Sequence, residues 1–248
     1  MKKLREFLFQ LREFVYQLLL VDLIRLIIAS IRYFVLATVL RRFKVFESES
    51  KDIGINTVHH NHNALSLDRI WNLAVNRSKL LINPLAAIRM SKRTPILCIG
   101  PRAEGELLYL KGFGFKDIRG YDLMSYSPWV DLGDMHNMPY KDDSFGVIIM
   151  GWVIAYSDSR KKAAAEAVRV VKNGGRIAVG VEFYTEKKED LDKRLGYEFC
   201  NKEQMMCVQD ILDLFGRHVD RIEFTQDVPD EYPEDYKFNM LVIFTVKK

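Results

Sequence analysis

Short apolar runs alternate with segments of helical spacing throughout the chain beyond residue 95. Apolar runs bounded by turn residues predict buried strands, which in chain order are Ile96–Ile99, Ile118–Tyr121, Trp129–Leu132, Phe145–Met150, Arg176–Glu182, Val219–Thr225 and Phe238–Val246. Apolar positions three and four apart predict helices at Ala103–Lys111, Ser159–Val171 and Glu203–Phe215. The second helix is expected to begin after Asp158 or Ser159 and to end at the glycine cap Asn173–Gly175. This alternation predicts a parallel sheet with helices on its faces.

The last two predicted strands are joined by the acidic, proline-bearing segment Asp227–Asp235. About a dozen residues without a helix are too few for a parallel crossover, so the final strand is expected to return antiparallel. The predicted fold class is therefore α/β, a Rossmann-like doubly wound sheet that is mostly parallel with one antiparallel C-terminal strand. An N-terminal helical extension completes it. The reversed strand departs from the all-parallel dinucleotide-binding fold.

Residues 1–46 contain neither Gly nor Pro and are rich in Leu, Ile, Phe and Val, which predicts helix almost throughout. Asp22, Arg25 and Arg32 interrupt every apolar window of about 20 residues, which argues against a membrane span. A small-residue cleavage site is missing, which argues against a signal peptide. Two interpretations stay open: an amphipathic helix in the interface of an anionic membrane, or a helical arm packing on the body or on a second subunit.

The predicted organisation has three parts: an apolar and basic helical segment over 1–50, a linker with helices over 51–94, and the sheet-bearing domain over 95–248. Two helices are expected in the middle part, at Leu65–Arg77 with Ser66 as its cap, and at Pro84–Met90. The polar stretch before them holds His59, His60 and His62. We interpret these as loop histidines and expect no metal site, because no Cys or carboxylate stands at a suitable spacing.

The positive charge of the chain is concentrated at its N-terminus. Residues 1–46 hold nine basic and three acidic residues, whereas the whole chain has a net charge of only +4. This favours an anionic membrane surface or self-association through residues 1–46, and no nucleic-acid partner, since no basic patch interleaved with aromatics follows. Cys98, Cys200 and Cys207 form no disulfide framework. Their pattern predicts a cytoplasmic protein, with membrane contact, if any, at the periphery.

A strand, a glycine turn and a helix N-terminus follow one another at Ile96–Glu106, which favours a nucleotide-type ligand. Gly100 makes the turn, and Arg102 and Glu104 occupy the places where a Gly-x-Gly-x-Gly run would have further glycines. Asp122 ends the second predicted strand, 22 positions after Gly100. A carboxylate at that edge can accept two hydrogen bonds from a ribose diol.

The stretch from Pro95 to Lys248 resembles the class I S-adenosylmethionine-dependent methyltransferases of the small-molecule type. The motifs that carry the resemblance are the turn Ile96–Arg102, Gly120-Tyr121-Asp122-Leu123, Leu132–Tyr140 with Asp142–Ile149, Gly151–Asp158 and Glu166–Arg176. The resemblance implies S-adenosylmethionine as cofactor, with Asp134 at the adenine amino group and Met135 beside the ring. The implied cofactor-binding residues are Gly100, Pro101, Arg102, Glu104, Asp122, Leu123, Asp134, Met135 and Gly151.

The sequence departs from the family at Cys98, where an acidic residue is usual, and Glu104 or Glu106 is the candidate to replace that acid near the methionine amino group. Methyl transfer is a direct displacement on an activated sulfonium, so the protein must align the acceptor and, for an acidic acceptor, remove a proton. No residue is compelled to be that base, and the catalytic residue stays unknown. The candidates are His136 and Tyr156, and with lower weight Asp158, Glu182 and Tyr184.

Three functions are compatible with these patterns. The first is S-adenosylmethionine-dependent methyl transfer to a small-molecule, sugar or lipid-linked acceptor. The second is a non-catalytic S-adenosylmethionine-binding or scaffold protein on the same fold, which the departures at Cys98, Arg102 and Glu104 favour. The third is an NAD-dependent oxidoreductase, against which the reversed terminal strand and the run around Asp134 count.

Overall fold

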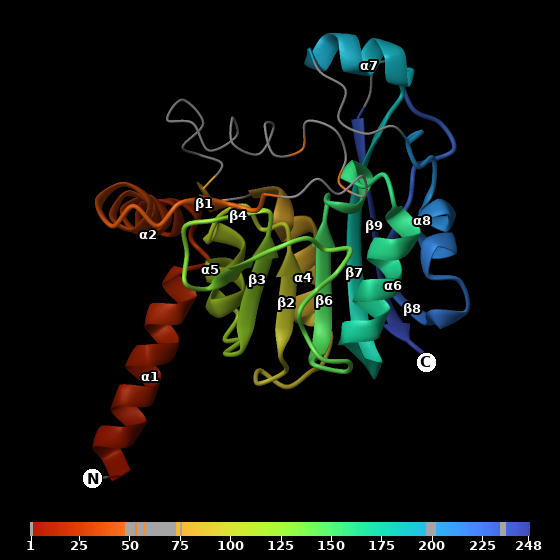
Figure 1. The fold of residues 1–248 in the computed structure, drawn as a ribbon. Coiled ribbons are helices and arrows are strands. Elements are labelled where there is room, and N and C mark those ends of the chain that lie inside the picture. Colours follow the sequence, from red (N-terminus) through yellow and green to blue (C-terminus); the bar gives the residue numbers. More distant parts are fainter. Residues whose placement is uncertain are drawn as a thin grey trace.

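A seven-stranded sheet forms the centre of the molecule (Figure 1). The structure, a computed structural model, describes residues 2–47, 53, 57, 73–74, 76–196, 202–233 and 237–248. The strand order is β5-β3-β2-β6-β7-β9-β8. The strands are β2 (Ile96–Ile99), β3 (Ile118–Asp122), β5 (Val130–Leu132), β6 (Phe145–Gly151), β7 (Val171–Tyr184), β8 (Val219–Gln226) and β9 (Lys237–Val246).

The strand directions confirm the predicted fold class. β2 pairs in parallel with β3 and β6, and β6 pairs in parallel with β7. β9 runs antiparallel to both β7 and β8, between which it is inserted. The connection from β8 to β9 is too short for a crossover helix, so the chain can only turn back along its neighbour.

Helices cover both faces of the sheet, and alternate strand residues divide the core between them. Ile96 and Cys98 pack with α4 (Lys79–Ala87) and α5 (Gly105–Gly112). Leu97 and Ile99 point to the other face, where α6 (Arg160–Val170) and α8 (Val208–Phe215) pack. Every side chain of β2 is buried, as expected for a central parallel strand.

Several predicted helix boundaries were wrong. α4 begins at Lys79, so Pro84 lies inside it instead of starting it. α6 ends at Val170, because Val171 already pairs in the sheet with Phe145. Asn173–Gly175 therefore belongs to β7 and caps no helix.

α8 starts five residues later than predicted, at Val208. Cys207 is extended, and its backbone N–H donates to the Asp210 carboxylate at 3.3 Å, which fixes the helix start there. A further helix, α7 (Lys188–Leu195), was not predicted. It ends at Gly196, whose φ of +78° suits glycine.

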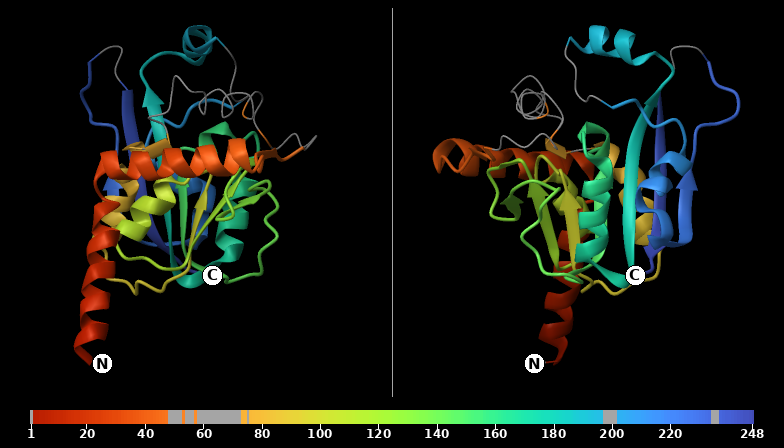
Figure 2. Two further views of the ribbon diagram at one scale, coloured as in Figure 1. Left: turned by 90° about the vertical axis from the view of Figure 1, so that its left-hand side faces the viewer. Right: turned by 45° about the vertical axis from the view of Figure 1, so that its right-hand side comes forward.

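The N-terminal segment is largely helical, as predicted, but the helix is broken after Leu18 and a short strand follows at Lys44–Val45. α1 (Lys2–Leu18) and α2 (Asp22–Tyr33) are followed by a π-helical turn, η1 (Phe34–Val39). β1 (Lys44–Val45) then pairs antiparallel with β4 (Met124–Ser125). Figure 2 shows α1 projecting from the body while α2 lies across it. Among the residues that the structure describes, no single helix is long and apolar enough to cross a bilayer; one bent pair passes the test of length and composition.

Parts of the middle segment lie outside the described residues. These include His59, His60 and His62, the cap Ser66 and most of the predicted helix Leu65–Arg77. The end of that range forms a 3-10 turn, η3 (Asn76–Ser78). The division of the chain at residues 50 and 94 stays a prediction.

Candidate functional site

The carboxyl ends of four adjacent strands bring the predicted cofactor residues to one edge of the sheet. Gly100 follows β2, Asp122 ends β3, Asp134 follows β5 and Gly151 ends β6. This edge is the upper one in Figure 1. Ligands of open α/β sheets bind at this edge, so the fold positions these residues as a cofactor site requires.

The turn after β2 has no room for a side chain at its first position. Gly100 has a φ of +70°, and a Cβ there would lie 2.0 Å from the Cγ1 of Val153. Arg102 also has a left-handed backbone, with a φ of +55°. Its backbone N–H donates to Oδ2 of Asp122 at 2.7 Å. The turn is therefore tied directly to the end of β3, and Pro101 between them is buried.

Asp122 is buried and holds the edge of the site together. Its Oδ2 accepts from Arg102 and its Oδ1 from the backbone N–H of Met124 at 3.2 Å. Burial raises the pKa of Asp122, and these backbone donors counteract part of that rise. A carboxylate oxygen can accept more than one hydrogen bond, so both oxygens keep capacity for a ribose diol.

Glu104 is engaged by the N-terminal helix. It is fully buried, and its carboxylate accepts from Nε and Nη2 of Arg32 in α2, the second at 2.9 Å, and from the Ser127 hydroxyl. Its backbone N–H donates to the Tyr126 hydroxyl at 3.2 Å. Glu104 therefore fixes α2 to the turn after β2. The sequence did not reveal that Arg32 is its partner.

Glu106 places a second buried carboxylate next to Cys98. Its Oε2 accepts from the Ser78 hydroxyl at 2.7 Å, and the Cys98 thiol interacts with the carboxylate. Its Oε1 has no nitrogen or oxygen partner among the described residues. Burial raises the pKa of Glu106 and, together with that carboxylate, the pKa of the Cys98 thiol. Glu106 therefore supplies an acidic group beside the strand position where the family has one. A buried acceptor without a partner fits the ammonium group of a methionine moiety.

Neutralising Glu106 is expected to stabilise the fold at neutral pH. Its folded-state pKa is raised above the usual 4.5, so stability falls as the pH rises from that value through the folded-state pKa. Glu106→Gln removes this loss and raises the free energy of unfolding at pH 7 by on the order of 1 kcal/mol. Urea denaturation should show the gain vanish below about pH 4. Exposed Glu203→Gln is the control, and a loss of stability in Glu106→Gln at both pH values would contradict the account.

A buried hydrogen-bonded chain joins Asp134, His136 and Ser157. The Asp134 Oδ1 accepts from the His136 backbone N–H at 3.0 Å and lies against Nδ1 of the same ring. The His136 Nε2 lies 2.6 Å from the Ser157 hydroxyl. The neighbouring carboxylate assigns the ring proton to Nδ1, so Nε2 accepts from Ser157.

The chain of these three residues fixes two loops of the site to each other. The same residue types form acyl-transfer triads, but Ser157 is completely buried and its Oγ also accepts from the backbone N–H of Ser159 at 3.0 Å. His136 is likewise buried between its two partners. The arrangement clamps the loop after β5, which carries Asp134 and Met135, onto the turn after β6. A role for His136 as general base stays a prediction.

Removing the imidazole is expected to destabilise the protein. His136→Ala leaves the Asp134 carboxylate and the Ser157 hydroxyl without this buried partner, which costs about 1 to 3 kcal/mol. Thermal or urea unfolding measures the loss. His218→Ala is the matched control, because His218 lies at the surface and contacts the Lys247 carbonyl. Equal effects of the two variants would contradict the clamp.

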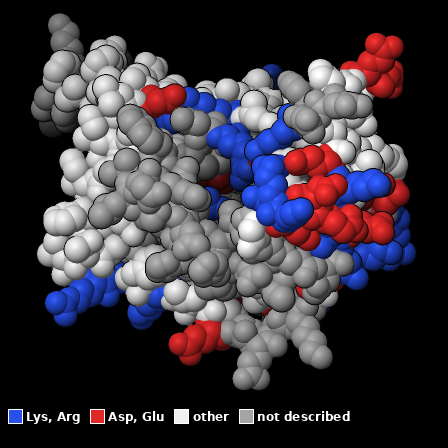
Figure 3. All heavy atoms as spheres, turned by 90° about the horizontal axis from the view of Figure 1, so that it is seen from above, with Lys and Arg blue, Asp and Glu red and all other residues white. Residues whose placement is uncertain are grey.

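Polar and aromatic residues gather at the ends of β6 and β7. The Glu182 carboxylate accepts from Nη1 of Arg77 and the Tyr184 hydroxyl, both at 2.5 Å, and pairs with Nζ of Lys237 at 2.6 Å. The Arg77 guanidinium lies 4.5 Å from the centroid of the Trp152 ring. Figure 3 looks onto this edge and shows Lys and Arg side chains gathered near its middle, beside a hollow.

The titration of these groups limits which of them acts as a base. Burial acts to raise the pKa of Glu182, but Arg77 and Lys237 outweigh it and lower that pKa. Burial raises the pKa of both Tyr156 and Tyr184. The two phenols therefore stay protonated at neutral pH, and the Tyr184 hydroxyl donates to the Glu182 carboxylate.

The comparisons with known proteins agree with this geometry. A family model described as "Methyltransferase domain" matches residues 109–179, which include Asp122, Asp134 and Gly151. The resemblance predicted from the sequence is therefore confirmed at the level of the fold: the chain has the class I S-adenosylmethionine-dependent methyltransferase fold, and residues 109–179 match this domain model.

Two solved structures show the same fold at low sequence identity. A methyltransferase of Thermotoga maritima is 19% identical, with a TM-score of 0.52, over 77% of this chain and 99% of its own. A protein of Listeria monocytogenes assigned to the S-adenosylmethionine-dependent methyltransferases is 14% identical, with a TM-score of 0.51, over 71% of this chain and all of its own.

A curated relative shares only a short stretch with the chain. An uncharacterized protein of Methanocaldococcus jannaschii is 33% identical over 61 residues, which is 21% of this chain and 30% of that protein. The match thus spans less than a third of the relative's length.

Proposed function

We propose that this protein transfers a methyl group from S-adenosylmethionine to a small-molecule, sugar or lipid-linked acceptor. The observation that carries the proposal is the set of acceptors at one sheet edge: Asp122 at the end of β3, and the unpartnered Oε1 of Glu106 behind the Gly100 turn. The family match over 109–179 supports the same cofactor.

Each part of the cofactor has a candidate partner. Asp122 would accept from the ribose hydroxyls, with Leu123 beside it. Asp134 and Met135 would lie along the adenine, and Glu106 would hold the ammonium group. The backbone from Gly100 to Arg102 and at Gly151 would approach the remainder. When bound, the cofactor supplies a methyl group on an activated sulfonium.

The chain's own contribution on the acceptor side is alignment. Tyr156 and Tyr184 would supply aromatic rings on that side, with Tyr184 held by Glu182 and Glu182 by Arg77. Trp152 is buried behind them, with its indole N–H donating to Asn239. Holding the acceptor in line with the methyl group lowers the entropic part of the barrier. No described residue is assigned as a general base.

A non-catalytic S-adenosylmethionine-binding or scaffold protein is the second candidate. One observation favours it: Glu104 and Asp134, two residues expected to contact the cofactor, already have protein partners in Arg32 and His136. A protein that keeps the fold but uses its acidic groups internally would show this pattern.

Calorimetric titration of the full chain with S-adenosylhomocysteine separates these functions. Binding near micromolar, with transfer of tritiated methyl groups from S-adenosylmethionine to an acceptor in cell extracts, supports the first. Tight binding without transfer to any fraction favours the second. Titration with NAD is the matched control and is expected to show no heat. Absence of S-adenosylhomocysteine binding contradicts methyl transfer and leaves only the scaffold form of the second candidate.

A further inference from the structure

The charged residues of α2 face the body of the protein. Arg25 is completely buried, and its guanidinium donates to the carbonyls of Leu19 at 2.8 Å and Ala74 at 3.3 Å, and to Asp22 at 2.6 Å. Arg32 pairs with Glu104. The charges that interrupt the apolar sequence are therefore all paired: Arg25 is buried, Arg32 is partly buried against Glu104, and the exposed Asp22 pairs with Arg25 and with Lys79 of α4.

The outer face of α2 is apolar and exposed. The large side chains along it are between 50% and 62% exposed: Leu23, Ile27, Ile31 and Phe34. Their spacing of four, four and three residues puts them on one stripe. Val35 and Val39 in η1 and Leu40 after it extend the stripe. Phe7, Leu11, Phe14 and Val15 form a second one on α1. Contiguous exposed apolar surface of this kind marks an interaction site.

The two helices lie on the same side of the molecule. Gln10–Leu18 and Asp22–Val39 meet at an angle of 87°. The left view of Figure 2 shows both in front of the sheet, as the two arms of an L. Two helices at a right angle on one side of the molecule form a broad, shallow contact face. Such a face fits a flat partner better than a partner with a groove.

The charges around this surface indicate which kind of partner fits it. Arg12, Arg41, Arg42 and Lys44 are all exposed. Arg25 and Arg32 are paired on the inner face, which leaves seven basic residues in 1–46 against Glu6 and Glu13. Contact between two copies through this surface would bring like charges together, whereas anionic headgroups would neutralise them.

We propose that the outer faces of α1, α2 and η1, called here the apolar arm, lie in the interface of an anionic bilayer without spanning it. Basic residues at its margin then contact the headgroups while the apolar stripes enter the acyl boundary. The proposal is independent of methyl transfer.

Co-sedimentation of the full chain with vesicles tests this proposal. We expect binding to phosphatidylcholine vesicles that contain phosphatidylglycerol, weaker binding at high salt, and little binding to phosphatidylcholine alone. Ile27→Glu combined with Ile31→Glu should reduce partitioning by about tenfold or more for each side chain. Ile222→Glu is the matched control, because Ile222 is 45% exposed on β8 and should leave binding unchanged.

A second variant keeps the test independent of folding. Arg41→Glu with Arg42→Glu leaves the apolar stripes intact and should abolish the preference for anionic vesicles, with an unchanged circular dichroism spectrum. Full-strength binding by the Ile27/Ile31 variant, or no binding by the unmodified chain, would overturn the proposal. So would a dimer, seen by light scattering, that the Ile27/Ile31 variant dissociates while vesicles bind neither form.

Discussion

Asp122→Ala is expected to weaken binding of S-adenosylhomocysteine by about 1 to 3 kcal/mol, which is roughly a 5- to 150-fold rise in Kd. The substitution removes both acceptors for the ribose hydroxyls. It also removes the acceptor of the Arg102 and Met124 backbone N–H groups, so the turn after β2 loses one of its hydrogen bonds to the end of β3 and keeps that from Gly100 to the Tyr121 carbonyl. Calorimetric titration measures the change.

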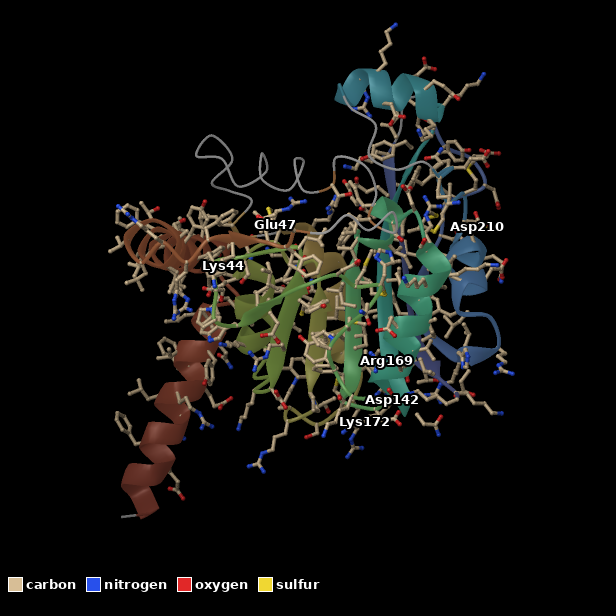
Figure 4. All side chains as sticks on the ribbon, viewed as in Figure 1. Lys44, Glu47, Asp142, Arg169, Lys172 and Asp210 are labelled. Carbon is tan, nitrogen blue, oxygen red and sulfur yellow. The ribbon has the colours of Figure 1, made fainter. Side chains whose placement is uncertain are left out.

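Asp142→Ala is the matched control for this variant. Asp142 is exposed, accepts from Nη1 of Arg169 at 2.8 Å, and lies at the opposite edge of the sheet (Figure 4). Its removal should leave affinity unchanged. Equal affinities of Asp122→Ala and the unmodified chain would refute the ribose assignment.

Arg32→Met is expected to lower the free energy of unfolding by about 3 to 5 kcal/mol. It leaves the Glu104 carboxylate fully buried without its cationic partner. The same variant also removes the guanidinium that lies 3.8 Å from the centroid of the Trp129 ring. Urea denaturation gives the loss directly.

Two further variants show whether the buried pair causes that loss. Arg12→Met breaks an exposed pair with Glu13 and should cost less than about 1 kcal/mol. Arg32→Met combined with Glu104→Leu removes the buried carboxylate together with its partly buried partner and should recover most of the stability. A double variant as unstable as Arg32→Met alone would contradict the assignment.

Most of the sheet was predictable because buried parallel strands are continuous apolar runs. Ile96–Ile99 was predicted with its observed bounds, and the strand of Phe145 differed by one residue at its end. The direction of the last strand followed from the shortness of the connection before it. Helix ends were less predictable, since they depend on local contacts such as the pairing of Val171 with Phe145.

The partners of the acidic residues could not be predicted from the sequence. Arg32 and Glu104 are 72 positions apart, and no local pattern links them. His136 reaches Ser157 through the turn after β6, where Trp152 has a φ of +62° that the sequence does not indicate. The sequence showed the apolar residues of α2. It did not show that the face with Arg25 packs against the body, because that depends on how the helix docks.

The arm and the cofactor turn are parts of one structure. The inner face of α2 holds Glu104, one residue before α5 begins, while its outer face is exposed. β1 then leads the chain back to β4, near the carboxyl edge, where Figure 4 labels Lys44 and Glu47. Deleting residues 1–46 would therefore remove core contacts as well as the apolar arm, so point variants are the sharper probes.

A crystal structure of the full chain with S-adenosylhomocysteine tests the central claim most directly. The account predicts the ribose hydroxyls on the Asp122 carboxylate, the adenine beside Asp134 and Met135, and the ammonium group at Oε1 of Glu106. A ligand bound away from the carboxyl ends of β2, β3 and β6, or one that leaves Asp122 without a contact, would contradict it.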